Sequence, residues 1–399
     1  MNDFTPTLRF VALSDVHYHD EHTVERDRMA QALCTANRVA EEHPSYKNFD
    51  ALAVVGDFAT DGTEIQFQAF KRTLDKGLRP GTRAILSLAS HEYHGDHVAE
   101  ASEKLERIFG QQPDVHAVIN GFHFISISPS KGTDYNKEKR EWAAAELAKA
   151  AAEDPRRPIF FFQHPHIQDT VTGSIDWGNN ELTTLLMHYP QVIDFSGHSH
   201  APINDPRSIH QEHFTSLGCG TLSYFELDEY DKYYGTVPPG DENAAQMLIV
   251  EANAQNRVRI TPWNLLTDKA FPLLWEIDTP SEPDSFQYTR AKRRSAAKAP
   301  RFPANAILRI EGNQLTFGQA DYAWEPVLDY YIRVRNAENG AIVRHYSLWS
   351  EFYFDPMPQT LSLPLEGLTP DMEYTVEVVA RGFWDNYGAD KLTGRFIAV

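Results

Sequence analysis

The sequence has 399 residues, a formal net charge of -19 and 42% hydrophobic residues. This length allows two or three domains, each with a core of its own. Because binding of a long polyanion needs a basic surface that displaces counterions, the acidic charge argues against polymeric nucleic acid as a partner. The sequence contains no run of about 18 uninterrupted apolar residues, so we expect no membrane insertion.

The N-terminus lacks a basic segment followed by an apolar stretch, which is the pattern of an export signal. We therefore expect a cytoplasmic protein, with a trimmed secreted chain as the alternative. The two cysteines, Cys34 and Cys219, are too few for a disulfide framework and lack the spacing of a thiolate metal site. Any bound metal ion must then be held by nitrogen and oxygen atoms.

Short apolar runs alternate with helix-like segments over roughly the first half of the chain, which indicates an α/β layered domain. The expected strands cover residues 8–13, 51–55, 84–88, 122–128, 158–162 and 191–195. The expected helices cover residues 24–41, 64–75, 98–109, 137–151 and 180–188. In such folds the chemistry is found on the loops that leave the carboxyl ends of the strands.

The second half of the chain is richer in strand patterns. Closing strands are expected at 247–251 and 258–261, so the first domain is predicted to cover residues 1–280. A basic segment with Pro and Ser, residues 281–302, is expected to be a linker. Residues 303–399 contain short alternating strands, for example 329–335 and 374–380, and predict an all-β sandwich.

The segment 368–374, which ends in Tyr374, resembles the tyrosine corner of fibronectin type III domains. This resemblance implies that residues 303–399 form a fibronectin type III-like domain. No cluster of ionisable residues in it suggests chemistry. We expect this domain to dock on the first domain or on a protein partner.

Acidic and histidine side chains directly follow the expected strands. Asp15 and His17 come two residues apart after the first strand and would project to the same side of an extended turn. Asp57 follows the second strand after Gly56, which permits a tight turn. Since a carboxylate has two oxygens, Asp57 could bridge two cations.

Three later strands end in the same way. Ser90 and His91 follow the third strand, His164 follows the fifth, and His198 and His200 follow the sixth. Each histidine taken alone is compatible with a structural role. Five strand ends that each deliver Asp or His indicate a single site.

These residues resemble the five motifs of calcineurin-like metallophosphoesterases, over about residues 8 to 262. The motifs are Asp15-x-His17, Gly56-Asp57, His91-Glu92, His164 and Gly197-His198-Ser199-His200. The resemblance implies an α/β fold of four layers, in which two mixed β-sheets are flanked by helices. It also implies a centre of two divalent metal ions, and manganese, iron and zinc all suit Asp and His donors.

The resemblance assigns a role to each site residue. It implies that Asp57 bridges the two metals, that the first metal is bound by Asp15, His17 and His200, and that the second is bound by His164 and His198. A metal-bridging hydroxide would attack the phosphorus of a small phosphorylated substrate, and His91 would protonate the leaving group as general acid. The remaining histidines near the motifs are expected at the rim or surface: His19, His22, His94, His97 and His166.

The third motif departs from the family pattern. The family has Gly-Asn-His there, and its Asn gives a carbonyl oxygen to the second metal, whereas this sequence has Ala89, Ser90 and His91. Ser90 is a shorter and poorer ligand, so we expect weak binding at the second metal site. Ala89 is expected to restrict a turn that glycine leaves free.

Two subclasses of the family are disfavoured. Thr60 stands where purple acid phosphatases place a metal-binding Tyr, and Thr60-Asp61-Gly62 replaces the Asp-Arg-Gly of protein serine/threonine phosphatases. Phosphodiesters, nucleotides, pyrophosphates and phosphomonoesters remain open as substrates. The alternative to an enzyme is a catalytically weakened or non-catalytic scaffold that acts as a binding module, and Ala89 and Ser90 support it.

Overall fold

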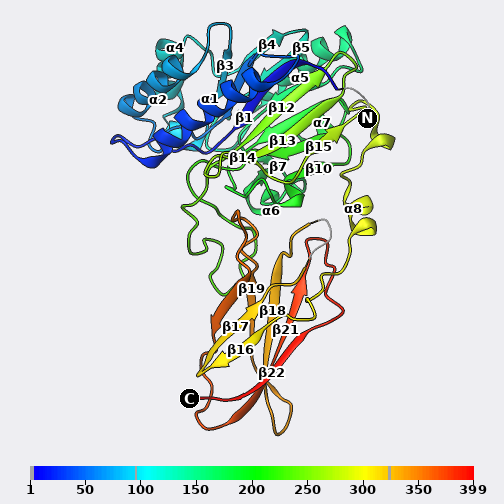
Figure 1. Ribbon diagram of the computed structural model, residues 1–399. Coiled ribbons are helices and arrows are strands. Elements are labelled where there is room, and N and C mark those ends of the chain that lie inside the picture. The colour runs from blue at the N-terminus through cyan, green and yellow to red at the C-terminus, as the bar shows by residue number, and fades with distance from the viewer. Residues whose placement is uncertain (1–3, 95–96, 322–324) are drawn as a thin grey trace. The chain divides into compact units, whose positions relative to one another are not determined.

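The computed structural model describes residues 4–94, 97–321 and 325–399. The chain divides into two compact units (Figure 1). The first contains Met1–Asp228 and Gly240–Thr289, and the second contains Glu229–Pro239 and Arg290–Val399. The second unit therefore includes a segment from the middle of the chain.

Two mixed β-sheets form the centre of the first unit (Figure 1). The first sheet consists of β1 (Pro6–Leu13), β2 (Ala51–Val55), β3 (Arg83–Ser87), β12 (Gln246–Asn253), β13 (Val258–Asn264), β14 (Lys269–Ala270) and β15 (Trp275–Ile277). Its strand order is β14-β13-β12-β1-β2-β3, with β15 paired to β13. Strands β1, β2 and β3 run parallel to one another, so their carboxyl ends meet at one edge.

The second sheet has the order β10-β11-β9-β6-β5-β4. Its strands are β4 (Val115–Ile119), β5 (Phe122–Ser126), β6 (Ile159–Phe162), β9 (Val192–Ser196), β10 (Ile209–Gln211) and β11 (Thr215–Gly218). Strands β5, β6 and β9 are parallel neighbours. The strands that lead into the expected motifs are thus adjacent within each sheet.

The two sheets pack face to face through aromatic side chains. The ring of Phe10 on β1 lies 5.1 Å from that of Phe124 on β5 and 4.8 Å from that of Phe160 on β6. The outer face of the first sheet packs against α1 (Val24–Glu42), α2 (Glu64–Gly77) and α4 (Val98–Phe109). The outer face of the second sheet packs against α5 (Lys137–Glu153) and α7 (Thr183–Leu186). The expected four-layer sandwich is therefore confirmed.

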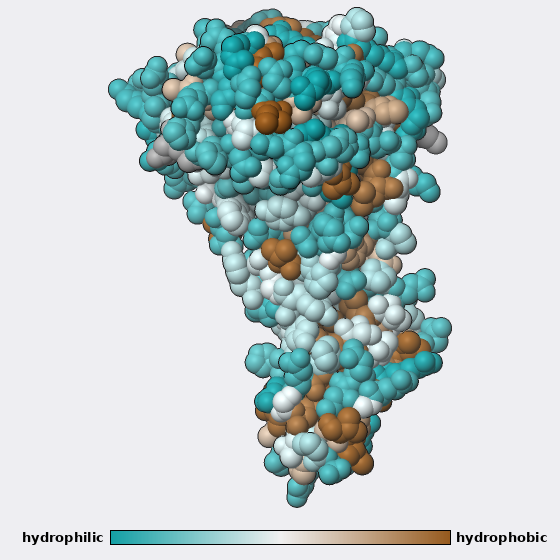
Figure 2. Space-filling model, turned by 90° about the vertical axis from the view of Figure 1, so that its left-hand side faces the viewer, coloured by the Kyte–Doolittle hydropathy of each residue, from teal (hydrophilic) through white to brown (hydrophobic). Residues whose placement is uncertain are grey.

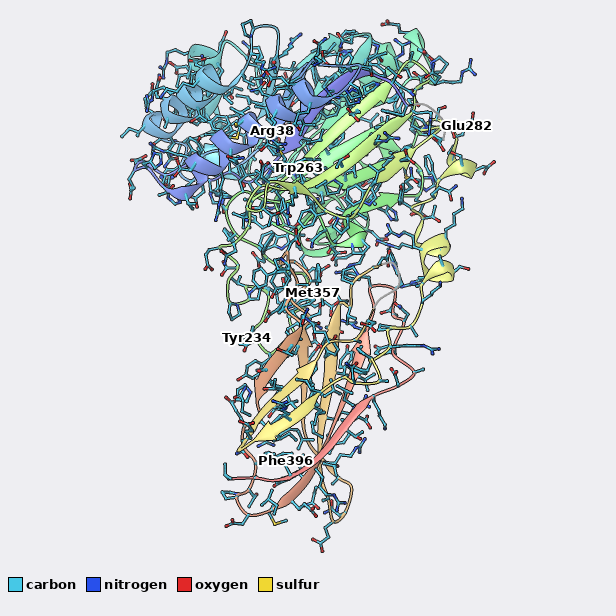
Figure 3. The ribbon with its side chains drawn as sticks, viewed as in Figure 1. Arg38, Tyr234, Trp263, Glu282, Met357 and Phe396 are labelled. Carbon is cyan, nitrogen blue, oxygen red and sulfur yellow. The ribbon has the colours of Figure 1, made fainter. Side chains whose placement is uncertain are left out.

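Helix α1 is tied to the first sheet at its surface. Arg38 of α1 lies beside Trp263 of β13, with its guanidinium carbon 5.8 Å from the ring centre (Figure 3). Its Nη2 atom is 2.8 Å from Oδ1 of Asp268. Exposed ion pairs of this kind contribute little energy, so the buried apolar face of α1 supplies most of its stability.

Hydrophilic side chains cover most of the face that Figure 2 shows, in agreement with the acidic, charge-rich composition. Within the described residues, no helix combines the length and the apolar composition that crossing a bilayer requires.

The second unit is an antiparallel β-sandwich with sheets of the orders β16-β17-β20 and β19-β18-β21-β22 (Figure 1). Its strands are β16 (Leu308–Glu311), β17 (Gln314–Gly318), β18 (Asp329–Asn336), β19 (Ile342–Trp349), β20 (Thr360–Pro364), β21 (Glu373–Arg381) and β22 (Leu392–Ile397). The hydroxyl of Tyr374 accepts a hydrogen bond of 3.1 Å from the backbone N–H of Thr369. This bond is the tyrosine corner that the sequence predicted.

A buried lysine holds residues 229–239 in the sandwich. Nζ of Lys232 lies 2.7 Å from Oδ2 of Asp329 and 4.8 Å from the ring centre of Trp349. Arg381 binds the same carboxylate, with its Nε 2.9 Å from Oδ1. Removal of one partner from a buried ion pair is strongly destabilising, so this segment is an integral part of the second unit.

Short elements complete the structure. They are α3 (Ser90–Tyr93), α6 (Ser174–Trp177), α8 (Arg290–Ala296), β7 (His166–Ile167) and β8 (Gly178–Asn179). The expected linker thus contains the α8 helix. Strand β4 was not predicted, and α7 covers fewer residues than the 180–188 that were expected.

Asp194, on the buried strand β9, gives the first prediction. Burial raises the pKa of this carboxyl group to about 8 from its usual 3.8. Between about pH 4 and pH 8 the folded state therefore binds one proton more than the unfolded state, and stability falls as the pH rises. This residue alone should lower the free energy of unfolding by about 1.4 kcal/mol for each pH unit in that window.

Urea unfolding between pH 5 and pH 8 checks this effect. Asp194→Asn should gain stability relative to the unsubstituted protein as the pH rises, because an amide does not ionise. The exposed Asp284→Asn is the control and should follow the unsubstituted protein. Parallel pH profiles for Asp194→Asn and the unsubstituted protein would contradict the prediction.

Candidate metal centre

The fold brings the expected Asp and His residues together at neighbouring strand ends. Their ligand atoms form three overlapping groups: Asp15, His17 and His200; His17, Asp57 and His91; and Asp57, His164 and His198. Within each group these atoms lie within 4.8 Å of one another. Asp57 belongs to two of the groups, as does His17, so the cluster is continuous.

Asp15 lies at the centre of three imidazole rings. Its Oδ1 atom is 3.3 Å from Nε2 of His200 and 3.9 Å from Nε2 of both His17 and His164. Its Oδ2 atom accepts a hydrogen bond of 3.0 Å from the backbone N–H of His198. One carboxylate oxygen therefore faces the rings, while the other fixes the loop that carries two of the histidines.

Asp57 is oriented in a similar way. Its Oδ2 atom lies 2.9 Å from Nε2 of His164, and its Oδ1 atom accepts a hydrogen bond of 3.1 Å from the backbone N–H of His91. The Asp57 carbonyl accepts hydrogen bonds from the N–H groups of Val16 and His17 at 2.9 and 3.0 Å. The loops after β1, β2 and β3 are thus joined through this one residue.

Backbone carbonyl groups set the tautomers of three histidines. The Nδ1 atoms of His164, His200 and His91 lie 2.7, 3.0 and 2.8 Å from the carbonyl oxygens of Val55, Tyr224 and Thr60. A carbonyl oxygen can only accept, so Nδ1 carries the proton in each ring. In the neutral rings Nε2 then carries the lone pair, which is the arrangement of metal-binding histidines.

Two buried polar atoms in the cluster have no hydrogen-bond partner among the residues that the structure describes. They are Oδ1 of Asp15 and Nε2 of His164, and the latter forms no hydrogen bond with Asp57 although the two side chains are close. Both residues are fully buried. Buried polar atoms are rarely left unpaired unless an ion or water satisfies them. The donor set therefore fits a centre of divalent metal ions.

The electrostatics of the cluster agree with this assignment. Although burial opposes charge on His164, the Asp57 and Asp15 carboxylates raise its pKa to about 10. Burial and the nearby His164 lower the pKa of His198 to about 4. Burial disfavours the charged form of Asp15, yet His200 and His164 hold the pKa of this carboxyl well below its usual range. The site thus contains buried anions that attract a cation.

Five site residues have a backbone conformation that is rare for residues other than glycine. Their φ angles are +53° for Asp15, +54° for His17, +50° for Asp57, +74° for His198 and +54° for His200. Each such residue costs on the order of 1–3 kcal/mol and persists only where the surrounding structure imposes it. Strain of this kind gathers at functional sites.

Two glycines allow the loops to approach one another. Gly56 has a φ of +82°, and a Cβ atom there would lie 2.5 Å from Nδ1 of His164. A Cβ atom on Gly197 would lie 1.9 Å from the Ser14 hydroxyl and 2.5 Å from Oδ2 of Asp15. No side chain fits at either position without displacing the site.

Glu92 is a site residue to which the sequence assigned no role. Its buried carboxylate accepts hydrogen bonds from the backbone N–H groups of Asp57, Ala59 and Ala89 at 3.1, 2.8 and 2.8 Å. Burial and the Asp57 charge raise its pKa well above the usual value. Glu92 joins the loops after β2 and β3. Its position directly after His91 in the sequence is the signal that could have identified it.

His166 was expected at the rim, and this prediction is wrong. The residue is 2% exposed, and its two ring nitrogens each lie 2.7 Å from a hydroxyl oxygen, one on Ser196 and the other on Ser199. Burial lowers the pKa of His166 to about 3, so the ring is neutral. The other four expected rim histidines are at least partly exposed: His19, His22, His94 and His97.

The structure also changes the interpretation of Ala89. Its backbone is extended, with φ -149° and ψ -163°, so glycine would bring no conformational advantage. The expectation that Ala89 restricts the turn is therefore wrong. Ser90 begins α3, and its hydroxyl forms no hydrogen bond with any described residue.

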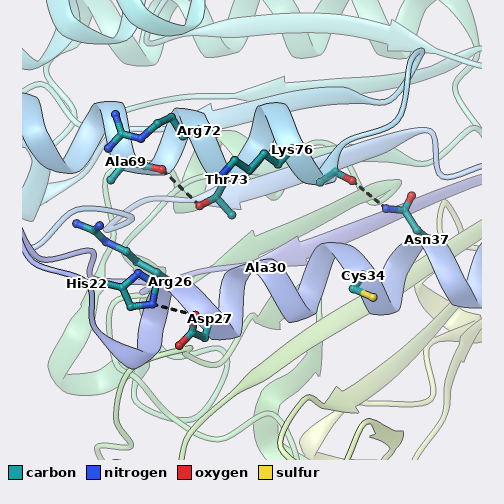
Figure 4. A pocket seen from close by; sticks show the side chains of 11 residues that line it. His22, Arg26, Asp27, Ala30, Cys34, Asn37, Ala69, Arg72, Thr73 and Lys76 are labelled. Atoms are coloured by element: carbon teal, nitrogen blue, oxygen red, sulfur yellow. Dashed lines mark hydrogen bonds and ion pairs between the residues drawn. The ribbon is translucent and has the colours of Figure 1, made fainter.

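A separate groove lies between α1 and α2 and contains none of the expected site residues (Figure 4). Its volume is about 580 Å³, and its lining includes His22, Arg26, Asp27, Arg72 and Lys76. His22 and Asp27 form an ion pair across one end at 2.9 Å. The Asp/His cluster is thus distinct from this groove.

Comparison with known proteins finds one matching family. The family model described as calcineurin-like phosphoesterase matches residues 8–202, which contain every expected ligand. No curated protein matches the chain in sequence. Among solved structures, the chain is similar to a purple acid phosphatase, PPD1, from yellow lupin (Lupinus luteus), with 13% identity and a TM-score of 0.48. The match covers 68% of this chain and 53% of that chain, so this chain spans about half the length of the lupin enzyme.

Two further solved structures are similar to the sandwich. An fn3 domain of human collagen alpha-1(XX) is 18% identical over 26% of this chain and 88% of that chain, with a TM-score of 0.19. A duf3244 family protein with an immunoglobulin-like β-sandwich from Bacteroides vulgatus is 19% identical over 25% of this chain and 91% of that chain, with a TM-score of 0.18. At these TM-scores we base no conclusion about function on the three structures.

Proposed function

We propose that the chain is a metal-dependent phosphohydrolase that acts on a small phosphorylated substrate, because residues 8–202 match the calcineurin-like phosphoesterase family model. The observation that carries this proposal is that two buried ligand atoms, Oδ1 of Asp15 and Nε2 of His164, lack a hydrogen-bond partner among the described residues. They lie within a cluster whose other members are also metal-binding residue types. A structural network of histidines would have satisfied these atoms with hydrogen bonds.

We assign the ligands from the three residue groups. Asp15, His17 and His200 would hold one ion, His164 and His198 would hold the other, and Asp57 would bridge the two. When bound, two divalent ions supply Lewis acidity, which lowers the pKa of a shared water and stabilises the charge of the phosphoryl oxygens. The chain itself contributes fixed imidazole orientations, set by the backbone carbonyl groups.

We infer the substrate class from the net charge of the protein and the size of the phosphorylated molecule that it would accept. A net charge of -19 opposes a polymeric nucleic acid but not a small phosphate ester at a cationic metal centre. Phosphodiesters, nucleotides and pyrophosphates all fit this description.

We assign to His91 the role of general acid. Its Nδ1 proton is donated to the Thr60 carbonyl, so a proton for the leaving group has to be carried on Nε2. The ring lies 4.5 Å from that of His17, and its backbone N–H is bonded to Asp57. His91 is accessible to solvent, in contrast to the buried His164. This position suits proton transfer to a departing alkoxide.

Hydrolysis of bis(p-nitrophenyl) phosphate with added manganese tests the proposed function. Asp57→Asn should lower kcat/KM by at least about 100-fold, because loss of a residue that only orients a ligand already costs about 10–100-fold and we propose Asp57 as a ligand itself. Asp61→Asn is the matched control, since Asp61 lies on the same loop and, among the described residues, its side chain bonds only to Gln66. Absence of hydrolysis with any divalent metal would contradict an enzyme and favour the alternative, a non-catalytic binding module.

Another prediction concerns His91. His91→Ala should slow turnover by about 10²–10⁴-fold, because the leaving group then departs without a proton donor. Elemental analysis should show an unchanged metal content. The exposed His97→Ala serves as the control. A loss of bound metal in His91→Ala would instead identify His91 as a ligand, and an unchanged rate would remove it from the mechanism.

A further prediction concerns the second metal site, where we expect weak binding. Ser90→Asn should raise the manganese content and affinity by up to about 10-fold, because an amide carbonyl would reach farther than the serine hydroxyl. Ala89→Gly should add nothing, since Ala89 is extended. Competition with a metal indicator dye measures the affinity. Equal affinity in Ser90→Asn and the unsubstituted protein would show that Ser90 does not limit metal binding.

A further inference from the structure

Two aromatic rings flank the Asp/His cluster, and neither belongs to the family motifs. Trp177, the last residue of α6, lies 5.1 Å from the ring of His198 and nearly perpendicular to it, at 86°. Tyr224 lies 4.1 Å from the ring of His200 and 6.3 Å from that of His17. The two rings thus contact different histidines of the cluster.

Both side chains are partly exposed and keep a free hydrogen-bond donor. Neither Nε1 of Trp177 nor the hydroxyl of Tyr224 bonds to any residue that the structure describes. The buried tyrosines nearby differ, because the hydroxyls of Tyr93 and Tyr135 bond to Pro129 and Gln163 at 2.6 and 3.2 Å. An accessible ring with an unused polar group is typical of a binding surface rather than of a core.

The loops that carry the two rings are held together by Asp228. Its Oδ2 atom accepts hydrogen bonds from the hydroxyl of Thr172 and the N–H of Gly173 at 3.1 and 3.2 Å, immediately before α6. Asp228 lies shortly after Tyr224 in the same segment of the chain. Although burial opposes its charge, the guanidinium of Arg207 lowers the pKa of this carboxyl. The Asp228 side chain that joins the two loops is therefore ionised at neutral pH.

Gly173 places the α6 loop against the histidine loop. It has a φ of +80°, and a Cβ atom there would lie 2.5 Å from Cβ of Ser199. The loop of Trp177 therefore packs directly beside His198, and Asp228 fixes it relative to the segment of Tyr224. Both rings have a defined position beside the proposed metal ions.

We propose that Trp177 and Tyr224 bind the planar base of a nucleoside phosphate ester whose phosphate faces the Asp/His cluster. This inference rests on the proposed function, which places the phosphate at the cluster. An aromatic ring attracts any base through stacking, and the two free donors match the acceptor atoms of bases and ribose. The substrate class is thereby narrowed from phosphorylated compounds in general to nucleotides or their diesters.

Calorimetric binding of AMP and ribose 5-phosphate to the manganese-loaded protein tests the inference, because the two ligands differ by the base. The unsubstituted protein should bind AMP more tightly by on the order of 10-fold. Trp177→Leu and Tyr224→Leu should each reduce the ratio of the two affinities towards one. The exposed Tyr387→Leu, in the sandwich, is the control and should keep the ratio.

The ratio of the AMP affinity to the ribose 5-phosphate affinity distinguishes base binding by the two rings from a purely structural role of the rings. If the two rings only orient His198 and His200, each substitution changes the affinities for both ligands in the same proportion, and the ratio stays constant. That result, or equal affinities in the unsubstituted protein, overturns the inference. The comparison in the unsubstituted protein remains decisive even if a substituted chain does not fold.

The hydrolysis assay keeps this inference distinct from the proposed function. Hydrolysis of bis(p-nitrophenyl) phosphate together with equal binding of AMP and ribose 5-phosphate refutes the base-binding role and leaves the phosphohydrolase. A ring-dependent preference for AMP without hydrolysis under any divalent metal supports the base-binding site and refutes catalysis.

Discussion

The structure of the first unit depends on two carboxylates that are buried at the ends of neighbouring strands. Asp15 and Asp57 are 0% and 1% exposed, and a buried charge is very costly unless a cation or a set of hydrogen bonds compensates it. Backbone N–H groups bond one oxygen of each carboxylate, and the other oxygen faces imidazole nitrogens. The proposed metal ions would complete this compensation. The same ions would thus stabilise the buried carboxylates and supply the chemistry.

The loops around these carboxylates store conformational strain that the layers behind them support. Five of the proposed ligand residues adopt positive φ angles, each on a loop that begins where a buried parallel strand ends. Glu92 and Asp57 then connect the loops through backbone hydrogen bonds, so no loop can relax alone. A rigid, strained arrangement keeps the imidazole nitrogens close together before any ion binds.

The sequence predicted those features of the fold and the site that depend on neighbouring residues in the chain. The candidate ligands were recognised because each one follows an apolar strand, and the helices α1, α2, α4 and α5 were predicted from their length and pattern. Strand β4 was missed, although Asn120 and Gly121 form the turn of a β-hairpin with φ angles of +51° and +82°. Its alternating, half-exposed side chains gave a weaker pattern than the buried strands.

The roles of other residues depend on distant contacts and left no local pattern. The buried ring of His166 forms hydrogen bonds with Ser196 at the end of β9 and with Ser199 in the following loop, and Asp228 binds a loop far earlier in the chain.

The segment 229–239 also bears on the order in which the two units form during synthesis. Lys232 leaves the ribosome long before Asp329, its buried partner, exists. The hydrogen bond from the N–H of Phe225 to the carbonyl of Asp241 can already close the base of this loop. The segment acquires its buried contacts only when the last strands are translated. A shortened chain that ends before the sandwich would therefore leave Lys232 without Asp329, with Glu229 and Asp231 as its remaining acidic neighbours.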